Sequence, residues 1–202
     1  MKILLVNGSP HAEGSTFQAL SEVAAELRKL GAEAEIFHIG TQAVHGCIAC
    51  ATCRKTGRCI FQDDVMQKML DKMIEADGIV LGSPVYYAGP SGAFCTLLER
   101  AFYSGGGNLR YKPAAAVVVC RRGGASATFD RLNKFFTINR MPIVSSQYWN
   151  SVHARIPADV PEDQEGLQTM RTLAQNMHWM VSALKNQPRP KEETPITTSF
   201  TR

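Results

Sequence analysis

Four cysteines stand close together in the stretch CIACATCRKTGRC, residues 47–59. Their spacing is Cys-x2-Cys-x2-Cys-x5-Cys, formed by Cys47, Cys50, Cys53 and Cys59. Thiolates this close in sequence can wrap a single four-iron cluster, and bacterial ferredoxins use a similar compact run. Zinc sites usually pair two short cysteine spacings across a longer segment, which this stretch lacks. The spacing therefore favours a [4Fe-4S] cluster over zinc.

A second interpretation leaves the same four thiols without a metal. Arg54, Lys55 and Arg58 stand among them and favour the thiolate, which is the reactive form. Free or reversibly oxidised thiols would respond to oxidants, and the spacing leaves both interpretations open. The other two cysteines, Cys95 and Cys120, fall in a predicted helix and a predicted strand, so we expect them to be buried small apolar residues.

A turn rich in glycine and hydroxyl groups, NGSPHAEGST at residues 7–16, follows the first apolar segment. Free amides at a helix N-terminus and the positive end of the helix dipole bind anions there. The turn lacks the Gly-Lys-Ser/Thr ending of the triphosphate loop and the three glycines of the dinucleotide fingerprint. It therefore predicts a site for a mononucleotide phosphate. The simpler alternative is a turn in which Ser15 caps the helix.

Two later loops combine residues that suit a planar ligand. GSPVYYAGPSG, residues 82–92, places two tyrosines beside glycines, and aromatic side chains next to exposed backbone suit a flat ring. CRRGGASAT, residues 120–128, places two arginines and two glycines directly after an apolar strand. Glycine lets backbone amides approach a ligand, and arginine stabilises negative charge on a reduced ring.

These loops need a scaffold, and apolar segments alternate with helical patterns along the chain. Strands are expected at 2–6, 34–39, 78–83, 113–120 and 141–146. Helices are expected at 15–30, at 63–76 with Asp63 or Asp64 as cap, from Pro90, around 129–136, and at 161–184. This alternation predicts an α/β fold with a doubly wound five-stranded parallel sheet. In such sheets ligands bind beyond the carboxyl ends of the strands, where all three loops fall.

The chain has 202 residues, a length that suits one domain, and we expect this domain to span residues 1–185. The formal net charge is +4. The polar, proline-containing segment 186–202 is expected to be mobile or to cross a neighbouring subunit. No apolar run approaches the roughly 20 residues of a membrane span, and the N-terminus does not read as a signal peptide. We expect a cytoplasmic protein that does not associate with a membrane. Scattered Lys and Arg argue against nucleic-acid binding.

Together the three loops resemble the NADPH-dependent FMN reductase family of flavodoxin-like proteins, and the cysteine stretch is similar to its iron-sulfur flavoprotein branch. The resemblance covers about residues 1–185 and implies strand order 2-1-3-4-5, bound FMN, and a homodimer or homotetramer. It implies phosphate, ribityl and ring contacts from Ser9, His11, Ser15, Thr16, Pro84, Val85, Tyr86, Tyr87 and Gly89. The far side of the flavin would be covered by Arg121, Arg122, Gly123 and Gly124.

The predicted function is an FMN-dependent oxidoreductase that takes hydride from NADH or NADPH and reduces quinones, nitro or azo compounds, or free flavin. FMN would supply the chemistry, so the catalytic side chain is unknown; Tyr87 or an arginine of the third loop is a candidate proton donor. Two other classes stay open. One is an iron-sulfur flavoprotein that passes electrons between a [4Fe-4S] cluster, FMN and ferredoxin-type partners. The other is a thiol-based redox sensor.

Overall fold

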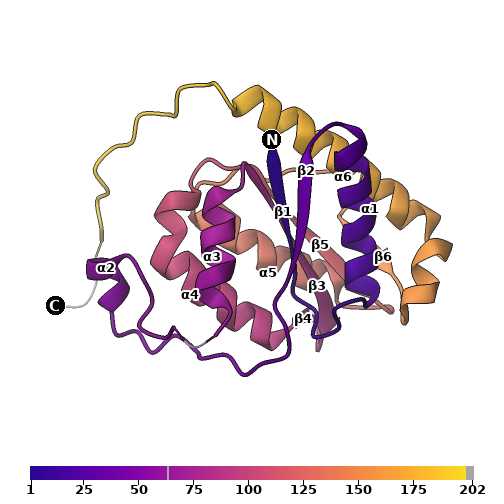
Figure 1. The fold of residues 1–202 in the computed structure, drawn as a ribbon, viewed down its shortest axis with the longest axis horizontal. Helices are drawn as coiled ribbons and strands as arrows, with labels where there is room; N and C mark the ends of the chain where they lie inside the picture. Colours follow the sequence, from indigo (N-terminus) through magenta and orange to yellow (C-terminus); the bar gives the residue numbers. More distant parts are fainter. Residues whose placement is uncertain (63, 199–202) are drawn as a thin grey trace.

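A computed structural model describes residues 1–62 and 64–198, which form a central parallel sheet between two layers of helices (Figure 1). The parallel strands are β1 (Lys2–Asn7), β2 (Glu33–His38), β3 (Gly78–Tyr86), β5 (Ala114–Cys120) and β6 (Ser151–His153). Their order is β2-β1-β3-β5-β6, and the short β4 (Gly89–Pro90) pairs antiparallel with β3. Counting only the parallel strands along the chain, this is the expected order 2-1-3-4-5.

The helices follow the strands as the alternating pattern predicts. They are α1 (Ser15–Lys29), α2 (Thr52–Thr56), α3 (Met66–Glu75), α4 (Gly92–Leu109), α5 (Ala125–Ile138) and α6 (Gln164–Leu184), with a 3-10 turn at Pro157–Glu162. Helices α1 and α6 cover one face of the sheet, and α3, α4 and α5 cover the other (Figure 1). No helix among the described residues is long and apolar enough to cross a membrane.

The strands are apolar throughout because both faces of the sheet are covered. In β1, Leu4 packs toward the layer of α3, α4 and α5, whereas Ile3 and Leu5 pack toward α1 and α6. A Cβ atom added at Gly82 would lie 2.7 Å from Leu20 Cδ1, so glycine at this position lets α1 pack tightly against β3. This close packing fixes where α1 begins relative to the sheet.

Two expected elements differ in the structure. The fifth strand, expected at 141–146, is instead β6 at Ser151–His153, and Ile143 makes only an isolated bridge with Ala114. The apolar run at 141–146 is buried in part without forming a strand ladder. Pro90 does not open a helix: it belongs to β4, and α4 begins two residues later after the cap Ser91.

Helix caps also differ from the expectation. The N-cap of α1 is Gly14, and Ser15 is the first helical residue, so Ser15 does not cap the helix. The N-cap of α3 is Val65, so Asp64 does not cap the helix as expected. Asp64 Oδ1 still accepts a hydrogen bond from the Met66 amide at 3.1 Å. The alternative cap, Asp63, lies outside the described residues.

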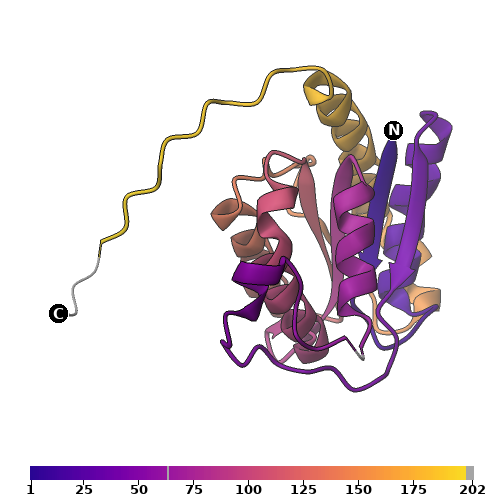
Figure 2. The ribbon, with the colours of Figure 1, turned by 60° about the vertical axis from the view of Figure 1, so that its left-hand side comes forward.

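The described part of the C-terminal tail, 186–198, leaves the end of α6 as an extended arm that projects away from the domain (Figure 2). Glu192 forms ion pairs with Arg110 and Arg140, at 2.6 and 2.9 Å. The first residues of the tail help to wall a cavity of about 660 Å³ beside the amino ends of β3 and β5. That cavity lies at the opposite end of the strands from the three predicted ligand loops.

Candidate functional site

The three predicted ligand loops, residues 7–16, 82–92 and 120–128, meet at the carboxyl ends of the strands, at the lower end of the sheet in Figure 1. This region is called the loop edge below. The Gly8 amide donates to the Gly82 carbonyl at 2.8 Å, which ties the first loop to β3. The third loop lies against the second, because a Cβ atom at Gly124 would be only 2.8 Å from Ala88 Cα and from Val85 Cγ1. The fold therefore brings all three loops to one place.

The first loop is shaped by Asn7, the buried last residue of β1. Its Oδ1 accepts from the Ser9 amide at 3.1 Å, and its Nδ2 donates to the Ala12 carbonyl at 3.2 Å. Ser9 Oγ accepts from the His11 amide at 3.1 Å, and His38 Nε2 lies 2.8 Å from the Ser9 carbonyl. The loop is thus held in one shape from inside.

This folded loop leaves the start of α1 open. Within the described chain, no side chain caps the helix at Gly14, so the amides of the first turn keep their donor capacity for a ligand. Helix α5 begins in the same way: its N-cap is Gly124, at φ +89°, again without a side-chain bond. Two helix N-termini without side-chain caps therefore border the same edge, and both favour negative charge.

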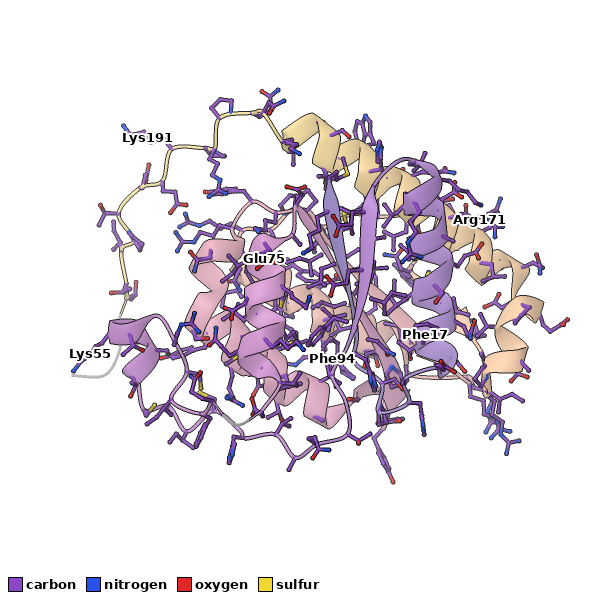
Figure 3. All side chains as sticks on the ribbon, in the orientation of Figure 1. Phe17, Lys55, Glu75, Phe94, Arg171 and Lys191 are labelled. Atoms are coloured by element: carbon purple, nitrogen blue, oxygen red, sulfur yellow. The ribbon has the colours of Figure 1, made fainter. Side chains whose placement is uncertain are left out.

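Serines on the second loop lock it to the first. Ser91 Oγ donates to the Gly8 carbonyl at 2.9 Å and accepts from the Phe94 amide at 3.3 Å. Ser83 Oγ accepts from the Ser91 amide at 3.1 Å. Gly8 is pressed against the Phe94 ring so closely that a Cβ atom there would overlap it. Figure 3 shows Phe94 near this end of the sheet, with Glu75 toward the other end.

A strained hairpin presents the two tyrosines. Tyr87 and Ala88 occupy the two-residue turn between β3 and β4, with φ angles of 49° and 58°. Such turns normally use Asn and Gly because both central residues need positive φ. Each non-glycine residue held there costs on the order of 1 kcal/mol, and such strain clusters at ligand sites. Tyr87 is fully exposed and Tyr86 is 45% exposed.

The predicted flavin contacts differ in burial. Ser9 and Thr16 are buried, the half-buried residues are Ser15, Pro84, Val85, Gly89 and Gly124, and the exposed ones are His11, Tyr86, Tyr87, Arg121, Arg122 and Gly123. The hydroxyls of the first loop thus lie inside the site, whereas the aromatic and cationic groups lie at its rim.

The four predicted metal ligands border one small hollow in the loop that follows β2. This hollow is lined by Cys47, Cys50, Cys53 and Cys59 together with Phe61, Arg100 and Tyr103, among others. In the part of the chain that the structure describes, no three His, Cys, Asp or Glu side chains are grouped closely enough to hold a metal ion. The thiols therefore share a hollow without converging on one point. Figure 3 places this region, marked by Lys55 on α2, to one side of the domain.

All six cysteines are free thiols. Hydrogen bonding with Thr52 lowers the pKa of the Cys50 thiol. Burial raises the pKa of Cys120, which is buried as expected, and of Cys95, which is only half-buried. The two thiols outside the cysteine loop are therefore the less reactive ones.

Several residues that build this site were not among the predicted site residues. They are Asn7, Ser83 and Ser91 in the loop edge, and Arg100 with Asp64 beside the cysteines. A signal existed for two of them: Asn7 interrupts the apolar run of β1 just before a glycine, and Arg100 lies between the apolar residues Leu98 and Ala101 of α4. Polar residues at positions otherwise apolar are the informative ones.

Comparisons with known proteins agree with this architecture. Residues 1–155 match the family described as NADPH-dependent FMN reductase. The chain is 34% identical to an iron-sulfur flavoprotein of Methanocaldococcus jannaschii over 193 residues, covering 92% of this chain and 100% of that one. Among solved structures, RosB with a bound 8-demethyl-8-formylriboflavin-5'-phosphate intermediate has a TM-score of 0.74 at 13% identity, with 99% of this chain and 92% of that chain covered. An archaeal flavodoxin has a TM-score of 0.62 at 12% identity, with 90% and 99% covered.

Proposed function

Because the chain belongs to the NADPH-dependent FMN reductase family, we propose that it is an electron-transferring iron-sulfur flavoprotein. FMN would bind at the three-loop edge, a [4Fe-4S] cluster in the cysteine loop, and electrons would pass between them and a ferredoxin-type partner. The observation that carries this proposal is the pairing of two features: helix N-termini without side-chain caps at one end of the sheet, and four cysteines around one hollow. The similarity to an iron-sulfur flavoprotein over 92% of this chain supports the same proposal.

The residues of the loop edge fit FMN. The phosphate would accept hydrogen bonds from the first-turn amides of α1 and from the hydroxyls of Ser9, Ser15 and Thr16. The ring would lie against the hairpin of Tyr86 to Gly89, with Arg121 and Arg122 at its rim. FMN would supply the hydride and electron chemistry, and the protein would position it and exclude water from one face.

The residues of the cysteine loop fit a cluster in their chemistry. Four thiols border one hollow, and soft thiolates are the ligands that iron-sulfur clusters use. Cys47 and Cys50 lie in the irregular segment before α2, where Ala49 and Ala51 have positive φ, and Cys53 lies on α2. Gly57, at φ +72°, ends α2 before Cys59. The loop would close around the cluster when it binds, as small metal sites commonly order on loading.

A second candidate is an NADH- or NADPH-dependent reductase of quinones, nitro or azo compounds, or free flavin. The exposed Tyr86 and Tyr87 favour it, because a site that opens to solvent admits a small donor and acceptor. The sensor is the third candidate, and the lowered pKa of Cys50 is the observation that favours it.

Anaerobic purification followed by iron, sulfide and flavin assays tests the proposal. About four iron atoms per chain with bound FMN support electron transfer. The variants Cys47→Ser and Cys59→Ser should lose iron and keep FMN, whereas Cys95→Ser, outside the loop, should keep both. Turnover of NADH or NADPH with FMN and no iron would favour the reductase. Neither FMN nor iron, with reversible oxidation of the loop thiols, would favour the sensor.

A further inference from the structure

A buried arginine lies beside the cysteine loop. Arg100, on α4, is a charged residue that is only 2% exposed. Its side chain pairs with Asp64, whose side chain is also 2% exposed. Removing a guanidinium from water costs free energy unless its N–H donors are hydrogen-bonded. The burial of Arg100 therefore calls for a structural or functional explanation.

The hydrogen bonds that the Arg100 guanidinium donates are all accepted by residues of the cysteine loop. Nε donates to Cys59 Sγ at 3.3 Å, Nη1 to Asp64 and to the His45 carbonyl at 3.1 Å, and Nη2 to the Phe61 carbonyl at 3.1 Å. The guanidinium also lies 5.4 Å from the centre of the Phe61 ring, which stacks on His45 at 4.2 Å. One side chain therefore joins both ends of the loop, residue 45 at one end and residues 59, 61 and 64 at the other, to the helix behind it.

We propose that Arg100 positions Cys59 and sets the reduction potential of the group that the cysteines hold. This inference rests on the proposed cluster. A hydrophobic residue could pack α4 against the loop at lower cost, and an ion pair alone would need only Asp64. Neither would supply an N–H donor to sulfur. Hydrogen bonds to the sulfurs are among the features that tune cluster potentials.

The sign of the effect follows from charge. Accepting one electron makes a cluster more negative, and a buried positive charge with an N–H···S bond stabilises that added charge. Arg100 therefore raises the reduction potential. Lysine at position 100 would keep the charge and lose the fork of donors, and methionine would lose both.

Redox titration of the anaerobically purified protein tests this. In Arg100→Met we expect the ratio of reduced to oxidised cluster at a fixed potential to fall at least tenfold, which is about 59 mV for a one-electron couple. Arg100→Lys should shift less, in the same direction. The matched control is Arg131→Gln, which removes an exposed arginine paired with Glu99 at 2.8 Å and should leave the potential unchanged. Bound FMN serves as the check that each variant folds.

A second measurement needs no cluster. In iron-free protein at about pH 10, where ordinary thiols are ionised, alkylation reports access to sulfur. Arg100→Met and Arg100→Lys should raise the rate at Cys59 on the order of tenfold, the loss expected for one charged hydrogen bond, and leave Cys47 unchanged. If the wild-type protein holds no cluster, the electron-transfer proposal fails and this measurement alone decides the role of Arg100. Unchanged alkylation of Cys59 overturns that role, and so does an unchanged potential in protein that carries the cluster.

Discussion

The loop edge and the cysteine loop are built in opposite ways. At the loop edge, three short turns on adjacent strands are joined by backbone bonds, by Ser83 and Ser91, and by glycines in close contact. The cysteine loop runs from residue 40 to α3, and most of its described residues are exposed. Arg100 ties it to α4 by hydrogen bonds, and Val44 and Cys59 pack against the core. The loop edge is held together by contacts within the protein. The cysteine loop is attached to the domain through side chains, Arg100 among them, and a group bound by its thiols would hold it further.

This contrast separates two kinds of redox site. A flavin needs a cradle that exists beforehand, because its affinity depends on amides already aimed at the phosphate. A cluster binds through four covalent ligands, so its loop can be ordered by the cluster itself. Substitutions that disturb the packing of the loop edge should therefore change folding and flavin binding together, whereas changes in the cysteine loop should leave the sheet intact.

The largest effect is expected at Gly8. In Gly8→Ala the new methyl group overlaps the buried Phe94 ring, which cannot move without disturbing the core around α4. We expect the free energy of unfolding to fall by about 3 kcal/mol, with loss of FMN binding, because overpacking shifts backbone and loop together. Urea unfolding and flavin fluorescence titration measure both.

Gly92→Ala is the control for Gly8. It stands in the first turn of α4, where a Cβ atom meets nothing within 4 Å. Alanine there should stabilise the protein slightly, since glycine is the weaker helix former. Equal destabilisation by both substitutions would show that the close contact at Gly8 is not what holds the edge.

The sequence predicted this edge well for physical reasons. Strand ends follow from apolar runs and glycine turns, and parallel topology then forces the loops together. The loop at 7–16 could be predicted from local sequence, without any long-range contact. The fifth strand was misplaced because the apolar run at 141–146 is buried in part without a ladder, whereas β6 is only three residues long. A strand that short carries almost no periodic signal.

A middle-sized effect is expected at Asn7. In Asn7→Leu the Ser9 amide and the Ala12 carbonyl lose the buried partner that shapes the loop. Unsatisfied buried groups cost about 1–3 kcal/mol each, so the dissociation constant for FMN should rise at least tenfold, with a smaller loss of stability. Asn108→Ala, at an exposed position of α4, should change neither. Unchanged FMN affinity in Asn7→Leu would argue that the loop holds its shape without Asn7.

For the cysteine loop, the sequence predicted which thiols lie near one another but not what ties them to the domain. The spacing indicated which thiols belong together, but the partner that ties them to the domain is 41 residues away from Cys59 in the sequence. No local pattern links positions that far apart. A lone arginine within the apolar stripe of a helix was the one available sign.

The titration of Cys120 tests how well the end of β5 is buried. Burial raises the pKa of Cys120, at the end of β5, so its thiol stays neutral to a higher pH in the folded protein than in the unfolded chain. The stabilisation this gives is present below the ordinary thiol pKa and is lost as the pH rises through the folded value. Iodoacetamide labelling followed by mass spectrometry should show Cys120 reacting at higher pH in native than in urea-unfolded protein. Identical profiles would contradict the burial effect.

The smallest and most discriminating effect is expected at the hairpin. Tyr87→Gly and Ala88→Gly each relieve a positive φ angle, so each should raise the free energy of unfolding by about 1 kcal/mol. Only Tyr87→Gly also removes an exposed ring that would lie against the flavin. We therefore expect Ala88→Gly to keep FMN affinity and Tyr87→Gly to weaken it several-fold, which corresponds to about 1 kcal/mol. If both variants bind FMN equally well, the Tyr87 ring does not contact the flavin, and the strain at this turn serves only to place the backbone.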